Sequence, residues 1–101
     1  MSFKQTLPHF YQSLLNLKGY EFDKVMSLKD SMLHVITIIE IEEKENHLLK
    51  PLVEDFYKYA LPLIEKFKVY DATEESKQYF SLARALTITL ILDFNHICED
   101  Q

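Results

Sequence analysis

Histidine and carboxylate side chains near the C-terminus are spaced as ligands of a metal ion could be. Asp93, His96 and Glu99 are three residues apart, which places them on one face of a helix. His47 could join them if its own segment ends at the same end of the molecule. Helical bundles bind iron, manganese or zinc through carboxylate and imidazole groups of this kind. One hypothesis is therefore a metal-binding helical bundle with a site formed by His47, Asp93, His96 and Glu99.

The ligand pattern is incomplete compared with the metal sites found in other bundles. Di-iron carboxylate bundles use two Glu-x-x-His pairs and two further glutamates, whereas this chain offers one Asp-x-x-His, at Asp93 and His96. Exposed histidines at helix ends are much commoner than metal ligands. We therefore expect no cofactor and keep the metal site as the alternative function.

The residues that catalysis requires are not arranged for it. Cys98 has His96 as a neighbour only two residues away, which is on a different face of a helix. The chain has one glycine and one cysteine, so neither a glycine-rich phosphate loop nor a cysteine pair for zinc can form. We expect that the protein is not an enzyme.

Acidic residues form the more distinctive pattern. If four helices run antiparallel, the chain ends of alternate helices meet, and eight carboxylates gather at one end of the molecule. These are Glu42, Glu43, Glu45, Glu54, Asp55, Asp93, Glu99 and Asp100, and we call this set the acidic end. Only Lys4, Lys44 and Lys50 oppose them there. The formal net charge of the chain is -5, so nucleic acid is an unsuitable partner.

Several of these carboxylates are placed unfavourably for helix stability. Glu43, Glu45, Glu99 and Asp100 are expected near helix C-termini, where the helix dipole already supplies negative partial charge. A functional interpretation is attraction of a basic partner. The alternative is an acidic surface that only keeps a small protein in solution.

Tyr57 is the aromatic residue best placed to contact a partner. It is two residues from Tyr59, so the two rings cannot share a helix face. If Tyr59 faces the core, Tyr57 lies near the surface, beside acidic residues. Its alternative role is to widen the apolar face of its helix. The expected partner-binding set is Glu42, Glu43, Glu45, Glu54, Asp55, Tyr57, Glu99 and Asp100.

Four segments must position these residues, and in each of them apolar residues recur at helical spacing. We expect helices over about 7–18, 23–47, 51–70 and 73–99. The second segment carries the stripe Val25, Leu28, Met32, Ile36 and Ile39. The third carries Leu52, Phe56, Tyr59, Leu63 and Phe67, and the fourth carries Phe80, Ala83, Thr87, Leu90, Phe94 and Ile97.

Glycine, proline and aspartate mark the ends of these segments. Gly19 suits a left-handed cap after the first helix, and Pro51 suits the first position of the third. Asp71 and Glu74 resemble a capping box before the fourth. Pro62 lies inside the third stripe, so we expect a kink in that helix.

Two stretches also have a strand-like composition. Residues 34–42 are rich in β-branched side chains, and residues 86–94 alternate between apolar and polar. An α+β fold with strands at 34–42 and 86–94 is therefore the alternative. Helices are favoured because each stretch lies inside a longer helical stripe without turn signals. We predict an all-α, four-helix antiparallel up-down bundle that forms one helical domain over residues 1–101.

Size and composition limit the function further. The 101 residues are 48% hydrophobic and 27% charged, and no apolar run is long enough to span a membrane. A single cysteine and the lack of a signal peptide favour the cytoplasm. The size and helix count are similar to those of histidine phosphotransfer domains, but the Lys-Gly pattern after the phosphorylated histidine is missing after His34. We expect His34 to be a buried or half-buried neutral side chain.

These observations favour a small acidic helical module that binds another protein with a basic surface. Inhibitor, immunity, chaperone and regulator proteins fit this description, and bacteriocin immunity proteins are similar in size and helix count. Wide apolar faces on three of the helices also allow a homodimer. We expect no membrane partner.

Overall fold

The structure, a computed structural model, describes residues 7–16, 22–68 and 73–99. The fold is all-α, and no strand occurs among these residues. The three main helices are α1 (Leu7–Asn16), α2 (Phe22–Glu43) and α5 (Glu74–Glu99). Between α2 and α5 the chain forms a 3₁₀ turn, η2 (His47–Leu49), then α3 (Lys50–Asp55), a π-helical turn, η3 (Phe56–Ala60), and α4 (Leu61–Lys66).

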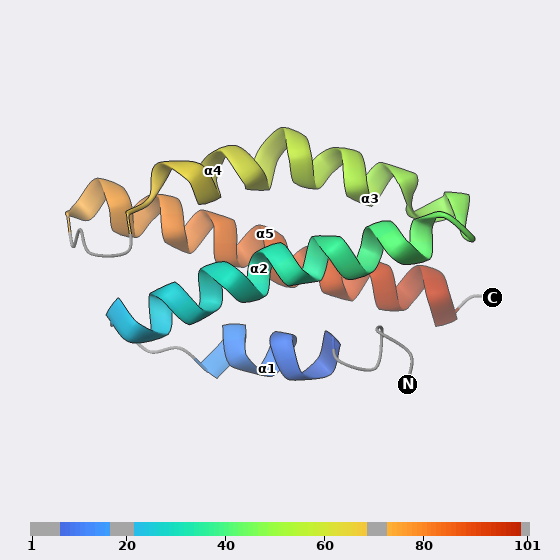
Figure 1. Ribbon diagram of the computed structural model, residues 1–101, viewed down its shortest axis with the longest axis horizontal. Coiled ribbons are helices and arrows are strands. Elements are labelled where there is room, and N and C mark those ends of the chain that lie inside the picture. Colours follow the sequence, from blue (N-terminus) through green and yellow to red (C-terminus); the bar gives the residue numbers. More distant parts are fainter. Residues whose placement is uncertain (1–6, 17–21, 69–72, 100–101) are drawn as a thin grey trace.

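The helices lie side by side along an elongated body of 42 × 25 × 17 Å. Figure 1 shows that α1, α2, the α3–η3–α4 segment and α5 run back and forth along the long axis. α5 contacts every other helix, and α2 contacts α1, α3 and α5. The end of α2, the start of α3 and the end of α5 therefore lie at the same end of the molecule, on the right of Figure 1. None of the described helices contains a stretch apolar enough to cross a membrane.

The two strand-like stretches are helical. Residues 34–42 lie within α2, and residues 86–94 lie within α5. In each stretch the side chains that point inward follow the helical period, as Val35, Ile36 and Ile39 do in α2. Burial of one helical face therefore outweighs the β propensity of these residues, and the α+β alternative is excluded.

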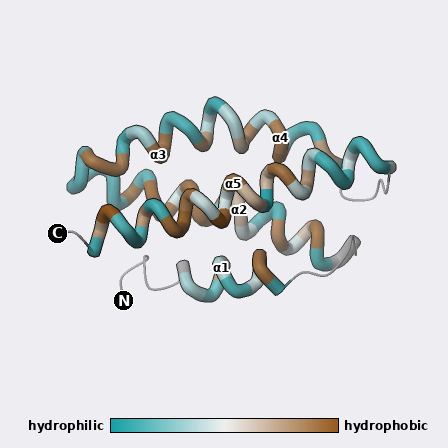
Figure 2. Tube along the Cα trace, turned by 180° about the vertical axis from the view of Figure 1, so that it is seen from behind, coloured by the Kyte–Doolittle hydropathy of each residue, from teal (hydrophilic) through white to brown (hydrophobic). Residues whose placement is uncertain are grey.

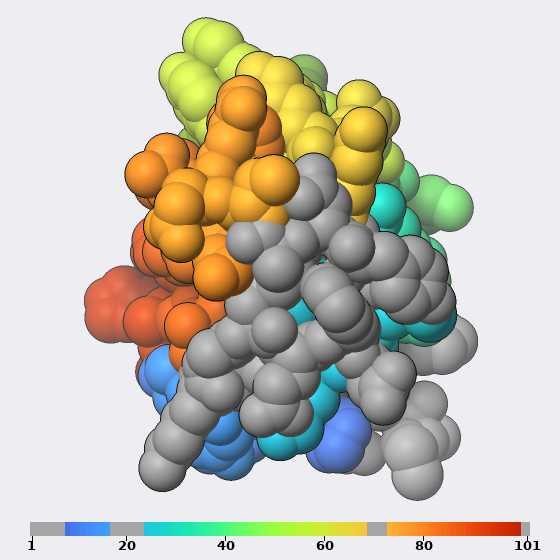
Figure 3. Space-filling view, turned by 90° about the vertical axis from the view of Figure 1, so that its left-hand side faces the viewer, coloured from blue at the N-terminus to red at the C-terminus, as the bar shows by residue number. Residues whose placement is uncertain are grey.

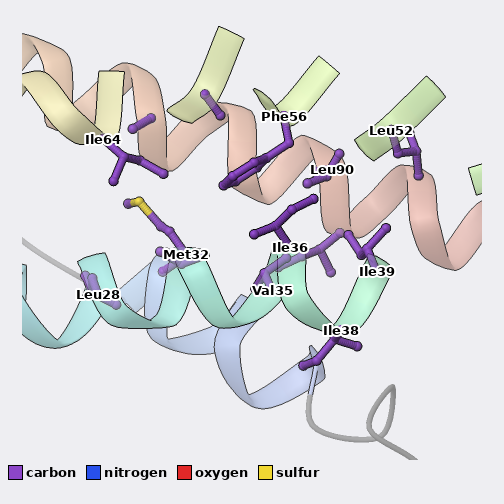
Figure 4. Packing of buried hydrophobic residues seen from close by; sticks show 14 of the residues in the cluster. Leu28, Met32, Val35, Ile36, Ile38, Ile39, Leu52, Phe56, Ile64 and Leu90 are labelled. Carbon is purple, nitrogen blue, oxygen red and sulfur yellow. The ribbon is translucent and has the colours of Figure 1, made fainter. Parts of the chain in front are cut away.

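One apolar core joins the helices. Figure 2 shows hydrophobic positions recurring along α2 and α5, and Figure 4 shows side chains from both halves of the chain pointing into the same cluster. The five stripe residues of α2 are all buried, as predicted. In α5 the stripe is buried from Phe80 to Phe94, and Ile97 is half-buried. Each buried Val, Leu, Ile, Met or Phe side chain contributes about 1.5–3 kcal/mol through its transfer from water.

α2 ends earlier than predicted, at Glu43 and not near His47. The N–H groups of Glu45 and Asn46 donate to the carbonyl of Glu42, at 3.1 and 3.0 Å, and turn the chain. The side chain of Asn46 then accepts the N–H of Leu48 at 3.2 Å and caps η2. Asparagine favours such local bonds over a continuing helix.

The third helix also ends earlier than predicted, at Lys66 and not near Tyr70. Phe67 has an extended backbone, with φ -76° and ψ 144°. Its ring is buried and packs edge-on against Phe80, with the ring centroids 5.2 Å apart. The chain leaves the helix so that this ring can enter the core against α5.

The π-helical turn η3 changes which residues of the third helix face the core. The N–H of Leu61 donates to the carbonyl of Phe56, five residues earlier. A regular helix would bring the ring of Pro62 against the carbonyl of Lys58, and the wider turn just before Pro62 relieves that clash. Helical backbone therefore continues up to the proline, and a kink at Pro62 itself stays a prediction.

The wider turn makes one part of the predicted stripe wrong. Tyr59 was expected in the core, but 51% of its side chain is exposed, and Leu63 is only half-buried. Ala60 and Ile64 are buried in their place. Because the hydrogen bond of η3 spans five residues and not four, the turn is wider than in an α-helix, and a spacing of four keeps Phe56, Ala60 and Ile64 on one face.

The start of α5 is fixed by two hydroxyl groups. Thr73 accepts the N–H of Ser76 at 3.3 Å, as an N-cap residue does. The buried hydroxyl of Ser76 accepts the N–H of Lys68 at 2.9 Å and donates to its carbonyl at 3.3 Å. Figure 3 views this end of the molecule, where the start of α5 (orange) lies beside the end of α4 (yellow). The predicted caps Gly19 and Asp71 lie outside the described residues.

A long-range contact attaches α1 to α5. The guanidinium group of Arg84 donates to the carbonyls of Leu14 and Leu15, the latter at 3.0 Å. These carbonyls belong to the last turn of α1, where a cation also complements the helix dipole.

Candidate functional site

The four candidate metal ligands do not form a cluster. His47 lies on η2, whereas Asp93, His96 and Glu99 lie on α5, and all four side chains are exposed. Within the described ranges, no three His, Cys, Asp or Glu side chains are placed to hold one metal ion. These residues are of the types that bind metal ions, but their side chains do not surround a common point.

The acidic end gathers where the topology predicts it. Three chain segments that meet at one end of the molecule in Figure 1 carry its described members. These are Glu42 and Glu43 on α2, Glu45 in the following turn, Glu54 and Asp55 on α3, and Asp93 and Glu99 on α5. Glu42 and Glu43 are half-buried and the others are exposed. Asp100 and Lys4 lie outside the described residues.

The negative charge of the acidic end is offset by few positive charges. Lys50 and Glu54 are 4.0 Å apart, and both side chains are about two-thirds exposed, so the pair contributes little to stability. Lys44 is exposed in the turn after α2. The last turn of α2 contains no basic residue, so Glu43 adds its charge to the negative end of the helix dipole.

Tyr57 is exposed, although Tyr59 does not face the core as that expectation assumed, and the hydroxyl group of Tyr57 makes a hydrogen bond within the chain. It donates a hydrogen bond to the carboxylate of Glu40 on α2. This hydrogen bond, together with partial burial and the charge of Glu40, raises the pKa of Tyr57 above its ordinary value of 10.0. With 47% of its side chain exposed, the ring remains available to a partner.

A groove beside the acidic end was not predicted. It lies between the α3–η3 segment and α5 and has a volume of about 120 Å³. Its lining residues are Leu52, Asp55, Phe56, Tyr59, Ala60, Leu86, Thr89, Leu90 and Asp93. Figure 4 shows Leu52, Phe56 and Leu90 in the buried apolar cluster, the first two from the α3–η3 segment and the third from α5.

The groove combines an apolar floor with acidic side chains. Leu52, Phe56, Ala60 and Leu90 are almost fully buried and form the floor, whereas Tyr59 and Leu86 are partly exposed. Asp55 and Asp93 are exposed, and neither carboxylate has an ion-pair partner among the described residues. A site with this lining can bind a group that is apolar in one part and cationic in another.

Sequence reasoning missed the groove because it depends on the register of η3. A regular helical period would have buried Tyr59, whereas the π-helical turn places it on the groove wall. The available signal was Pro62, two residues after Ala60, together with the four-residue spacing of Phe56 and Ala60. Asp93 was singled out as a metal ligand, but the structure places it on the groove with Asp55.

Two other residues have side chains that could take part in chemistry, His34 and Cys98. His34 is exposed, so the expectation of a buried or half-buried side chain is wrong. Its ring stacks on Phe10 of α1, with centroids 6.1 Å apart and planes 8° from parallel, and this contact with α1 does not bury it. Cys98 is half-buried, as expected.

Comparisons with protein-family models, with curated proteins and with solved structures found no match to this chain.

Proposed function

We propose that this chain binds another protein, one that presents a basic surface, and that the acidic end is the docking surface. The observation that carries the proposal is that carboxylates from α2, α3 and α5 gather at one end with few neighbouring cations. It is an inhibitor, immunity, chaperone or regulator type of function, without catalysis. The single cysteine is consistent with a cytoplasmic location.

The acidic end would act mainly on the rate of association. Charges of one sign attract an oppositely charged partner over about 10 Å at moderate salt, and added salt screens this attraction. Tyr57, exposed beside the acidic residues, supplies a rigid aromatic contact after the encounter. Electrostatic docking of this kind predicts fast association that slows as salt is added.

The proposal is tested by neutralising the acidic end without changing the fold. A triple variant, Glu42→Gln, Glu43→Gln and Glu45→Gln, removes three charges there. A matched control, Asp30→Asn, Glu65→Gln and Glu74→Gln, removes three charges elsewhere on the surface. Circular dichroism checks that both variants are folded.

Binding partners are captured from cell lysate with the unmodified chain at low and high salt, identified, and purified for rate measurements. We expect a basic partner whose association with the triple variant is about tenfold slower, while the control stays within about twofold. An acidic partner captured equally at both salt levels would overturn the proposal. So would equal rates for the two variants, or the capture of no protein at either salt level.

A further inference from the structure

The groove between η3 and α5 has two chemically different ends. α5 passes Leu86, then Leu90, then Asp93 on its way toward the acidic end, while the antiparallel segment passes from Ala60 back to Asp55. The half near Leu86 is therefore apolar, and the half near Asp93 is acidic. At a rise of about 1.5 Å per residue, Leu86 and Asp93 are roughly 10 Å apart along the helix.

The groove as a whole is about the size of one side chain. Its volume is about 120 Å³, somewhat less than the cavity of about 150 Å³ that holds benzene in another protein. The floor of the groove is almost inaccessible to water, because Phe56, Ala60 and Leu90 are at most 6% exposed. An aliphatic group placed there would cover the exposed parts of Tyr59 and Leu86, 51% and 38% of their side chains.

The acidic half attracts a cation. Asp55 and Asp93 line one small groove, carry two negative charges, and have no ion-pair partner among the described residues. A guanidinium group suits this end of the groove better than an ammonium group does, because its planar fork can donate two parallel hydrogen bonds to one carboxylate.

We propose that the groove anchors a segment of the partner protein that carries a leucine-like side chain and, about 10 Å away, an arginine. In a helix these residues are about seven positions apart, which places both side chains on one face. The inference rests on the proposed function and deepens it. The acidic end attracts the partner, and the groove selects the segment that is bound.

The inference is tested with a synthetic peptide and does not require the natural partner. The probe is an acetylated and amidated helical peptide of alanine and glutamine with one leucine and, seven positions later, one arginine. Two matched peptides replace the arginine by glutamate or the leucine by serine. Binding is followed by amide chemical shifts of the ¹⁵N-labelled protein.

We expect the arginine peptide to shift groove amides first, including those of Tyr59, Leu86 and Thr89. Binding should weaken about tenfold with either matched peptide and with the double variant Asp55→Asn, Asp93→Asn. The control variant Asp30→Asn, Glu65→Gln loses the same charge away from the groove and should bind within about twofold of the original chain.

Three results would overturn the inference. The first is tight binding of the glutamate peptide, and the second is a response confined to residues outside the groove. The third is a shift of the groove amides when the protein alone is concentrated, which would make the groove a contact between two copies. If the natural partner depends on Glu42, Glu43 and Glu45 but not on Asp55 and Asp93, protein binding stands and the anchor is wrong.

Discussion

The hydroxyl group of Tyr57 in η3 donates a hydrogen bond to the carboxylate of Glu40 in α2 and so links the π-helical turn to the central helix. Tyr57→Phe should lower the free energy of unfolding by about 0.5 kcal/mol at neutral pH, a small value because the pair is partly exposed. The matched control is Tyr59→Phe, which removes a hydroxyl from the same turn without removing this bond. Urea denaturation measures both effects.

The contribution of this bond should depend on pH in one direction. Glu40 raises the pKa of Tyr57 in the folded chain, so the bond is intact below the unfolded value of about 10 and is lost as the pH rises through the folded pKa. The difference in unfolding free energy between the original chain and Tyr57→Phe should vanish over that range. A difference that stays constant to higher pH would contradict this assignment.

Arg84 should determine whether α1 stays docked. Its guanidinium group donates to the carbonyls of Leu14 and Leu15 at the end of α1. Arg84→Gln should cost about 1–2 kcal/mol, because two charge-assisted hydrogen bonds and a favourable dipole interaction are lost together. Hydrogen exchange should speed up at the amides of α1 and remain slow in the middle of α5.

Lys77→Gln is the matched control for this change. Lys77 lies on the same helix and pairs with Glu74 at 3.8 Å on the surface, so its loss should cost less than about 0.5 kcal/mol. Equal effects of the two substitutions, or uniform acceleration of exchange along the chain, would mean that Arg84 does not act through α1.

The sequence was sufficient for the helices but not for the register of the third one. In α2 and α5 a single unbroken stripe of apolar residues identifies the buried face. After Phe56 two stripes are possible: one continues through Tyr59 and Leu63, and the other through Ala60 and Ile64. The first has the larger side chains and the regular period, so pattern alone favours it. Only the backbone near Pro62 selects the second.

One part of the candidate site, the acidic end, could be predicted from the sequence, and the other part, the groove, could not. Topology and helix ends suffice to place the acidic end, because charge position along an elongated helical molecule needs no side-chain detail. Predicting the groove requires knowing how one helix is rotated about its axis relative to its neighbour. The spacing of residues in the sequence does not give this rotation. Asp55 and Asp93 were therefore identified separately, and their meeting in one groove was not predicted.

If η3 is a one-residue insertion, removing one residue should restore a regular helix. Deletion of Lys58 together with Pro62→Ala should keep Ala60, Ile64 and Phe67 facing the core and change the unfolding free energy by less than about 1 kcal/mol. Deletion of Glu65 together with Pro62→Ala instead rotates Phe67 by about 100° and should cost at least about 2 kcal/mol. Similar losses for both deletions would show that the turn is not a tolerated insertion.

The acidic end should lower the stability of the chain in order to serve binding. Glu43 and Glu99 are the last residues of α2 and α5, where each negative charge opposes the helix dipole. Glu43→Gln and Glu99→Gln should each raise the free energy of unfolding by about 0.3–1 kcal/mol at low salt, and the gain should shrink as salt is added. Glu74→Gln, at the start of α5, should change stability in the opposite direction.

The same two substitutions should also slow association with a basic partner, because they remove part of the attracting charge. Each of the two variants, Glu43→Gln and Glu99→Gln, should therefore be more stable than the original chain and associate more slowly. If both variants gain stability and bind as fast as the original chain, the two carboxylates only make the surface hydrophilic, and attraction must come from the other members of the acidic end.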